Sequence, residues 1–120
     1  MRQQVKKISK LRTGDRLRAI RELTGLTQKE FAELLKVDLI HLKNMEYKKN
    51  RVTEECYEAM GLAFPELLPW FVYEGPVNLN GLRNSENKLC KFIAARIDAG
   101  LVPEGYFSED SFRDGDTKEG

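Results

Sequence analysis

Two short helices joined by a tight connection constrain the fold of this chain more than any other feature of its sequence. Thr27 and Glu30 fit a capping box, in which each side chain satisfies the free backbone amide of the other residue. The first helix is therefore expected over residues 28–35, and Asp38 is expected to cap a second helix over residues 38–47. Helices this short are not stable alone, so we expect them to pack tightly against each other.

Small and apolar side chains are spaced to fill the angle between these two helices. Ala32 lies where the two backbones come closest, and a larger side chain there would push the helices apart. The other candidate core residues of the pair are Phe31, Leu35, Val37, Leu42 and Met45. This packing leaves one face of the second helix open to solvent.

Further helices are expected on both sides of the pair, because capping and stop residues flank several apolar stripes. They are expected from about Asp15, after a cap at Thr13, to a stop at Gly25; from Thr53 to about Gly61; from Pro65; and from a cap at Asn84 or Ser85 to Ala99. We predict an all-α fold, a five-helix domain with a C-terminal helical extension. The division is a basic N-terminal arm (residues 1–13), a helical domain (14–73), an extension with one helix (74–107) and an acidic, disordered tail (108–120).

The small net charge of +1 conceals an uneven distribution along the chain. Residues 1–60 contain 14 Lys and Arg against 9 Asp and Glu, which gives +5, whereas residues 61–120 contain 6 against 10, which gives −4. This difference favours a polyanionic partner for the N-terminal half. The basic arm residues Arg2, Lys6, Lys7, Lys10 and Arg12 would follow such a partner or form an unstructured end.

Several other classes of protein are disfavoured by the residues present. No apolar run reaches about 18 residues, and the polar, basic start does not fit a secretory signal. Cys56 and Cys90 lack CxxC spacing and there is one histidine, so no metal site and no cofactor are expected. There is no glycine-rich phosphate loop and no convincing pair of nucleophile and base, so we do not expect an enzyme or a catalytic residue.

The segment from Leu26 to Val52, LTQKEFAELLKVDLIHLKNMEYKKNRV, resembles the helix-turn-helix family of phage repressors, Cro proteins and Xre-type regulators. The resemblance runs without gaps from about Asp15 to Leu68 and includes the Leu-Thr-Gln opening, Ala32, Leu42, Glu46 and Ala59-Met-Gly-Leu. It implies a fold of five short helices. It also implies a cytoplasmic, bacterial or phage-encoded protein that binds double-stranded operator DNA as a homodimer.

The chain departs from the family pattern at three places. Lys36 stands where the turn usually holds glycine, Glu46-Tyr47-Lys48 replaces Glu-Asn-Gly, and Val52 replaces a common proline. A side chain held at positive φ costs roughly 1 kcal/mol. The departures leave open whether the turn has its usual geometry and whether the backbone near residue 48 contacts a phosphate.

The predicted DNA-binding residues lie on the second helix of the pair and around it. They are Gln28, Leu39, Ile40, His41, Lys43, Asn44, Lys48, Lys49 and Arg51. Asn44 can pair with adenine, Lys43 with guanine or phosphate, and the three cations after the helix with the phosphate backbone. The side chain of His41 either donates a hydrogen bond to a phosphate or a base, or is exposed to solvent without contacting the DNA. For Leu39 and Ile40 three alternatives stand: contact with thymine methyl groups, a core position for one of them, or a protein partner.

Two further groups of residues carry structural expectations. The resemblance implies a buried ion pair between Arg21 and Glu46 that fixes the second helix against the first helix of the domain. A dimer interface is expected from Trp70, Phe71, Tyr73, Leu89, Phe92, Ile93 and Ile97, with the monomer core as the alternative for the three aromatic residues.

The predicted function is that of a sequence-specific transcriptional regulator, a repressor that binds a palindromic operator through the helix at residues 38–47. The alternative is a protein-interaction module or an antitoxin that uses the same fold to bind a protein.

Overall fold

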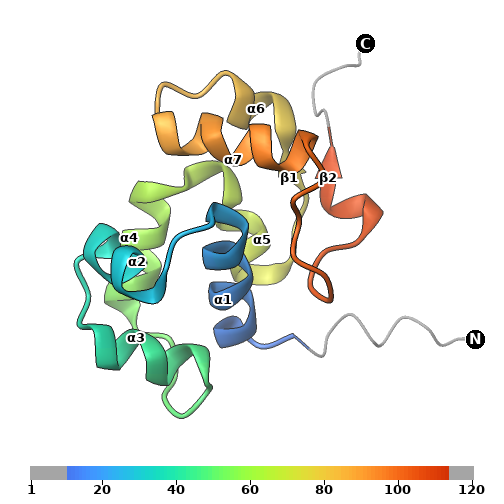
Figure 1. Ribbon diagram of the computed structural model, residues 1–120. Coiled ribbons are helices and arrows are strands. Elements are labelled where there is room, and N and C mark those ends of the chain that lie inside the picture. The colour runs from blue at the N-terminus through green and yellow to red at the C-terminus, as the bar shows by residue number, and fades with distance from the viewer. Residues whose placement is uncertain (1–10, 114–120) are drawn as a thin grey trace, which may run out of the picture.

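The computed structural model describes residues 11–113 and is mostly helical, as the sequence predicts (Figure 1). The helices are α1 (Thr13–Thr24), α2 (Gln28–Leu35), α3 (Leu39–Glu46), α4 (Glu54–Ala63), α5 (Leu68–Tyr73), α6 (Leu79–Arg83) and α7 (Lys88–Asp98). Single 3₁₀ turns cover Pro65–Leu67 and Glu109–Ser111, and two short strands, β1 (Val77–Asn78) and β2 (Phe112–Arg113), pair in parallel. None of the helices in this part of the chain is long and apolar enough to cross a membrane.

Side-chain caps start the central helices where the sequence predicts. The Thr27 hydroxyl accepts the amide of Glu30 at 3.1 Å, and the Glu30 carboxylate accepts the amide of Thr27 at 2.9 Å. At the start of α3 the Asp38 carboxylate accepts the amide of His41, and at the start of α4 the Thr53 hydroxyl accepts the amide of Cys56, each at 3.2 Å. The prediction for α1 was wrong by about two residues, because Thr13 is helical and the carboxylate of Asp15 accepts the Arg12 amide at 2.9 Å.

Helices α2, α3 and α5 are each followed by a left-handed residue other than glycine: Lys36 (φ 61°), Lys48 (φ 64°) and Glu74 (φ 62°). At the end of α2 the amide of Val37 donates to the carbonyl of Ala32 at 3.0 Å, which is the bond that closes a Schellman motif. The turn therefore has the geometry that glycine would give it, although Lys36 is strained there by roughly 1 kcal/mol. The backbone at Lys48 likewise has a left-handed conformation that glycine adopts without strain.

Helix α1 forms the centre of the core (Figure 1). It contacts α3, α5 and α7, and its residues Leu17, Ala19, Ile20 and Leu23 are fully buried. Phe31 of α2 stacks on Phe64 at the end of α4, with ring centroids 6.0 Å apart. Apolar residues of every helix are thus buried against this one element or its neighbours.

A buried arginine, which the sequence analysis did not single out, joins α1 to the end of α5. Arg16 donates to the carbonyl of Phe71 at 2.7 Å and to that of Val72 at 3.1 Å, and it pairs with Glu74 at 3.2 Å. Carbonyl groups in the last turn of a helix have no partner within the helix. Arg16 supplies donors for two of them while its own charge is neutralised.

The segment after α5, residues 75–113, differs from the prediction in two respects. It contains two helices rather than one, and α7 is capped by Asn87, not by Asn84 or Ser85. Residues 108–113, predicted as part of a disordered tail, form a 3₁₀ turn and β2, while residues 114–120 lie outside the described part. Phe107 stacks on Trp70 at 4.2 Å and β2 pairs with β1, so packing on the helical core orders this polar stretch.

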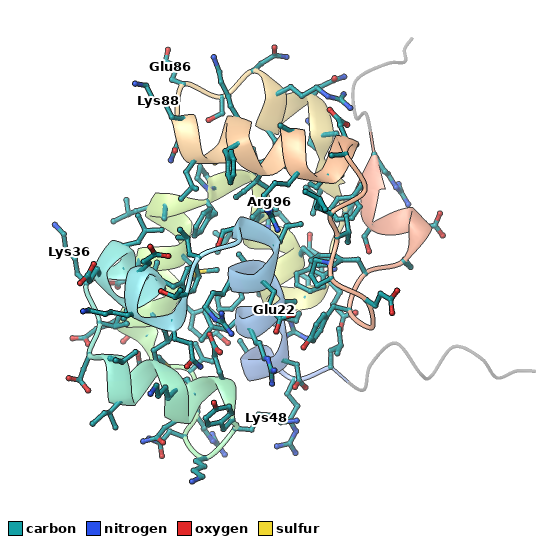
Figure 2. The ribbon with its side chains drawn as sticks, in the orientation of Figure 1. Glu22, Lys36, Lys48, Glu86, Lys88 and Arg96 are labelled. Carbon is teal, nitrogen blue, oxygen red and sulfur yellow. The ribbon has the colours of Figure 1, made fainter. Side chains whose placement is uncertain are left out.

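The C-terminal segment shares the core of the helical domain. Leu82, Cys90 and Ile93 are fully buried in the same apolar cluster as α1. Figure 2 shows Arg96 of α7 between that helix and α1, where its Nε donates to the carbonyl of Leu23 at 2.7 Å.

The burial of several aromatic and apolar residues corrects the predicted dimer interface. Trp70, Phe71 and Ile93 lie in the core of the single chain, so they are not available to a second copy while this fold is intact. Leu89 and Ile97 are half-buried against the same core. Of the predicted interface only Tyr73 and Phe92 are exposed.

We expect Lys36→Gly to raise the free energy of unfolding by about 1 kcal/mol, because glycine adopts the left-handed conformation without the steric cost of a Cβ atom. Urea denaturation monitored by the fluorescence of Trp70 would measure the change. Lys36→Ala is the matched control, since it removes the charge and retains the strain, and it should change stability by only a few tenths of a kcal/mol. Equal stability of the two variants would contradict the explanation.

Candidate functional site

Helices α2 and α3 pack against each other as the sequence predicts. Phe31, Ala32 and Leu35 of α2 are buried, as are Leu42 and Met45 of α3. Val37, in the connection between the helices, is half-buried against the same cluster. With its inner side committed to this packing, α3 exposes its opposite side at the edge of the molecule (Figure 1).

A buried carboxylate holds α3 in its orientation. Glu46, whose side chain is 0% exposed, accepts hydrogen bonds from Arg21 Nε at 2.8 Å and Nη2 at 3.1 Å. Gln28 Nε2 donates to the same carboxylate at 3.0 Å. The predicted pair of Arg21 and Glu46 is therefore confirmed, and Gln28 extends it so that the network joins α1, α2 and α3.

The predicted role of Gln28 changes with this geometry. Its side chain is half-buried and its amide nitrogen donates to Glu46, so the role that the structure shows for Gln28 is a structural one. As the first residue of α2 it still lies beside the network that orients α3. Contact between Gln28 and a nucleic acid stays a prediction.

The outer face of α3, which we define as Ile40, Lys43, Asn44 and Tyr47, follows from the burial of its residues. Ile40 is 66% exposed and Tyr47 is 52% exposed, Lys43 is exposed, and Asn44 is half-buried. These four residues are spaced by three, four and seven positions, so they share one side of the helix. Tyr47 was not among the predicted site residues, although its spacing from Ile40 was visible in the sequence.

The structure separates the two adjacent apolar residues at the start of α3. Leu39 is half-buried and packs on the core, whereas the side chain of Ile40 lies in solvent. Of the alternatives for this pair, the core position therefore holds for Leu39. His41 is half-buried beside the outer face, and its backbone amide is used by the Asp38 cap at 3.2 Å.

The chain leaves α3 through a tight turn into the basic loop, residues 48–51. The amides of Lys49 and Asn50 donate to the carbonyl of Asn44 at 2.8 and 3.3 Å, so the loop folds back on the end of the helix. Lys48 pairs with Asp15 at 3.1 Å. A Cβ atom on Gly14 would collide with the carbonyl oxygen of Met45, so this glycine permits α1 and α3 to approach closely.

A hollow with a basic rim lies between the basic loop and the start of α1. Its volume is about 520 Å³, and the cations that line it are Arg12, Lys48, Lys49 and Arg51. Within residues 11–113, Lys48 alone of the four has a carboxylate at ion-pair distance. Three exposed cations that converge on one hollow without a carboxylate partner favour an anion there.

Over the whole described part of this half, the cations of the hollow included, the two signs of charge nearly cancel. Residues 11–60 contain 10 Lys and Arg against 9 Asp and Glu, so the excess of +5 over residues 1–60 comes almost entirely from the four cations Arg2, Lys6, Lys7 and Lys10. Those four arm residues lie outside the described residues. The basic loop is thus a local concentration of positive charge.

The two cysteines are buried thiols. Burial is the main cause that raises the pKa of both Cys56 and Cys90 to about 11 from an ordinary value near 9.0, with smaller contributions from Glu46 and Glu66 respectively. Because so high a pKa leaves almost no thiolate at neutral pH, neither cysteine is suited to act as a nucleophile. Among residues 11–113 no group of three or more His, Cys, Asp or Glu side chains could hold a metal ion.

We expect Arg21→Met to lower the free energy of unfolding by about 3 kcal/mol, because it leaves the buried carboxylate of Glu46 without its main partner. Arg18→Met is a control on the same helix. Its pair with Glu22, at 2.9 Å, is largely exposed, so its loss should cost less than about 1 kcal/mol. Chemical denaturation of both variants would compare them. Similar losses of unfolding free energy in the two variants would show that the Glu46 network stabilises the fold no more than an exposed ion pair does.

Both thiols should resist modification in the folded chain. At pH 8 an aromatic disulfide reagent should label Cys56 and Cys90 at least ~100-fold more slowly than in urea, because the raised pKa lowers the thiolate fraction and the core excludes the reagent. Rapid labelling of either thiol in native buffer would contradict its placement in the core.

Comparisons of this chain with protein-family models, with curated proteins and with solved structures return no match. The function proposed below is supported by the arrangement of α2, α3 and the basic loop, together with the resemblance of residues 26–52 to helix-turn-helix regulators.

Proposed function

We propose that this chain is a sequence-specific DNA-binding regulator of the repressor-like helix-turn-helix type, with α2 and α3 as the motif and α3 as the recognition helix. The observation that carries the proposal is the orientation of α3. Its inner side is held by the Glu46 network, its outer face is exposed, and the basic loop follows it directly. A rigid, exposed helix next to a phosphate-compatible loop is what insertion into the major groove requires.

The residues divide into two roles in this proposal. Lys43 and Asn44 carry the polar groups of the outer face, and Asn44 can pair with the N6 and N7 atoms of adenine. Lys49 and Arg51, with Arg12 across the hollow, contact phosphates and set the position of α3 without reading sequence. Lys48 contributes its charge while it is held against α1 by Asp15.

A second copy of the chain belongs to the proposal, because one recognition helix reads only one half-site. Helix-turn-helix proteins bind two half-sites about one DNA turn apart, and symmetric operators mirror the two-fold axis of a dimer. Tyr73 and Phe92, exposed at the surface, are the predicted interface residues that this fold leaves available. Repression would follow from a dimer that occludes a promoter.

The test begins with selection of bound duplexes from a random pool by the full chain, followed by fluorescence anisotropy on the selected site. We expect Asn44→Ala to weaken binding to that site about tenfold and to leave binding to unrelated DNA nearly unchanged, because it removes a base contact. Lys49→Ala should weaken both equally and reduce the salt dependence, because it removes a phosphate contact. Failure of the folded chain to bind any duplex at low salt would refute the proposal.

The exposed Ile40 and Tyr47 favour a second candidate, in which the outer face of α3 binds a protein, as an interaction module or an antitoxin would. The same experiment separates the two. Enrichment of a defined half-site supports DNA, whereas no enrichment together with a stable complex that Ile40→Ala disrupts supports a protein partner.

A further inference from the structure

Ile40 is the one residue on the outer face of α3 without a hydrogen-bonding side chain. It lies in the first turn of the helix, directly after the Asp38 cap and Leu39, and it is 66% exposed. In helix-turn-helix complexes the first turns of the recognition helix are the part that contacts base edges. If α3 enters the groove as proposed, Ile40 is buried against the bases.

The local structure holds Ile40 in a defined place. Leu39 packs on the core at the neighbouring position and the Asp38 carboxylate accepts the amide of His41 at 3.2 Å, so the first turn of α3 is anchored on both sides of Ile40. A β-branched side chain in a helix strongly prefers one χ1 rotamer. Ile40 therefore presents a nearly rigid apolar surface and loses little freedom on binding.

Such a surface can distinguish one chemical group in the major groove. The four base pairs differ there in their donors and acceptors and in the C5-methyl group of thymine. The side chain of Ile40 cannot form hydrogen bonds with the donors and acceptors of the bases. It can recognise the methyl group, because burying a methyl group against an apolar side chain removes apolar surface from water.

We propose that Ile40 recognises the C5-methyl group of a thymine in each half-site, so that the operator carries a thymine methyl beside the base contacted by Asn44. This inference rests on the proposed function and names the kind of site that it selects. Asn44 lies one helical turn after Ile40 on the same face, and its amide suits adenine. The two residues together select neighbouring A·T pairs in the half-site.

The experiment replaces each thymine of the selected operator, one at a time, by deoxyuridine. This change removes the methyl group and leaves every hydrogen-bonding group of the base pair in place. For the unmodified chain we expect a three- to fivefold weaker affinity when the thymine at either of two symmetry-related positions is replaced, because each replacement removes one buried methyl group. Replacement of any other thymine should leave the affinity unchanged.

Ile40→Ala should bind the thymine operator more weakly and show no difference between thymine and deoxyuridine at that pair of positions. Ile40→Val should retain part of the difference. Leu62→Ala is the matched control, because Leu62 is an exposed apolar residue near the end of α4 and is not part of the outer face of α3, and its replacement should leave the profile unchanged. All four proteins should show the same thermal unfolding, since both substituted side chains are exposed.

The outcomes separate this inference from the function on which it rests. If the folded chain selects no duplex, the proposed function fails. If it selects an operator but the deoxyuridine scan is flat, or if Ile40→Ala retains the profile of the unmodified chain, DNA binding stands and methyl recognition is overturned.

Discussion

The buried carboxylate of Glu46 is the constraint on which the position of α3 depends. A fully buried charge is costly unless it is paired and hydrogen-bonded, and here Arg21 of α1 and Gln28 of α2 supply the bonds. A rotation of α3 that moved its outer face inward would break these bonds. One side chain thus ties three packed helices together and keeps the outer face of α3 in solvent.

Strained backbone surrounds this network at both ends of the pair. Lys36 and Lys48 hold left-handed conformations that glycine adopts more easily, which costs roughly 1 kcal/mol each. At Lys48 the strained turn makes further contacts possible. The turn directs the amides of Lys49 and Asn50 to the end of α3 and lets the Lys48 ammonium reach Asp15, so the basic loop begins close to the helix. At Lys36 the left-handed conformation lets the amide of Val37 donate to the carbonyl of Ala32 and so ends α2.

The C-terminal segment stabilises the domain from the side away from α3. In Figure 1, α7 and α3 lie at opposite ends of the molecule with α1 between them. Arg96 donates to a carbonyl in the last turn of α1, and Phe107 covers Trp70. Within the helical domain, Arg16 of α1 donates to a carbonyl at the end of α5. The contacts of Arg96 and Phe107 cover a helix end and an aromatic ring that the first five helices leave uncovered. They leave the outer face of α3 untouched.

Local chemistry in the sequence was sufficient for the starts of α2 and α3, because Thr27, Glu30 and Asp38 act on amides only a few residues away. The pair of Arg21 and Glu46 came from the family resemblance. Tertiary structure alone decided what depends on distant contacts: that Leu39 packs inward and Ile40 outward, that Arg16 is buried, and that Trp70, Phe71 and Ile93 belong to the core. It also decided that residues 108–113 are structured. Each of these depends on surfaces brought together from more than thirty residues away or from a neighbouring helix, and the pattern of residues along one helix does not contain that partner.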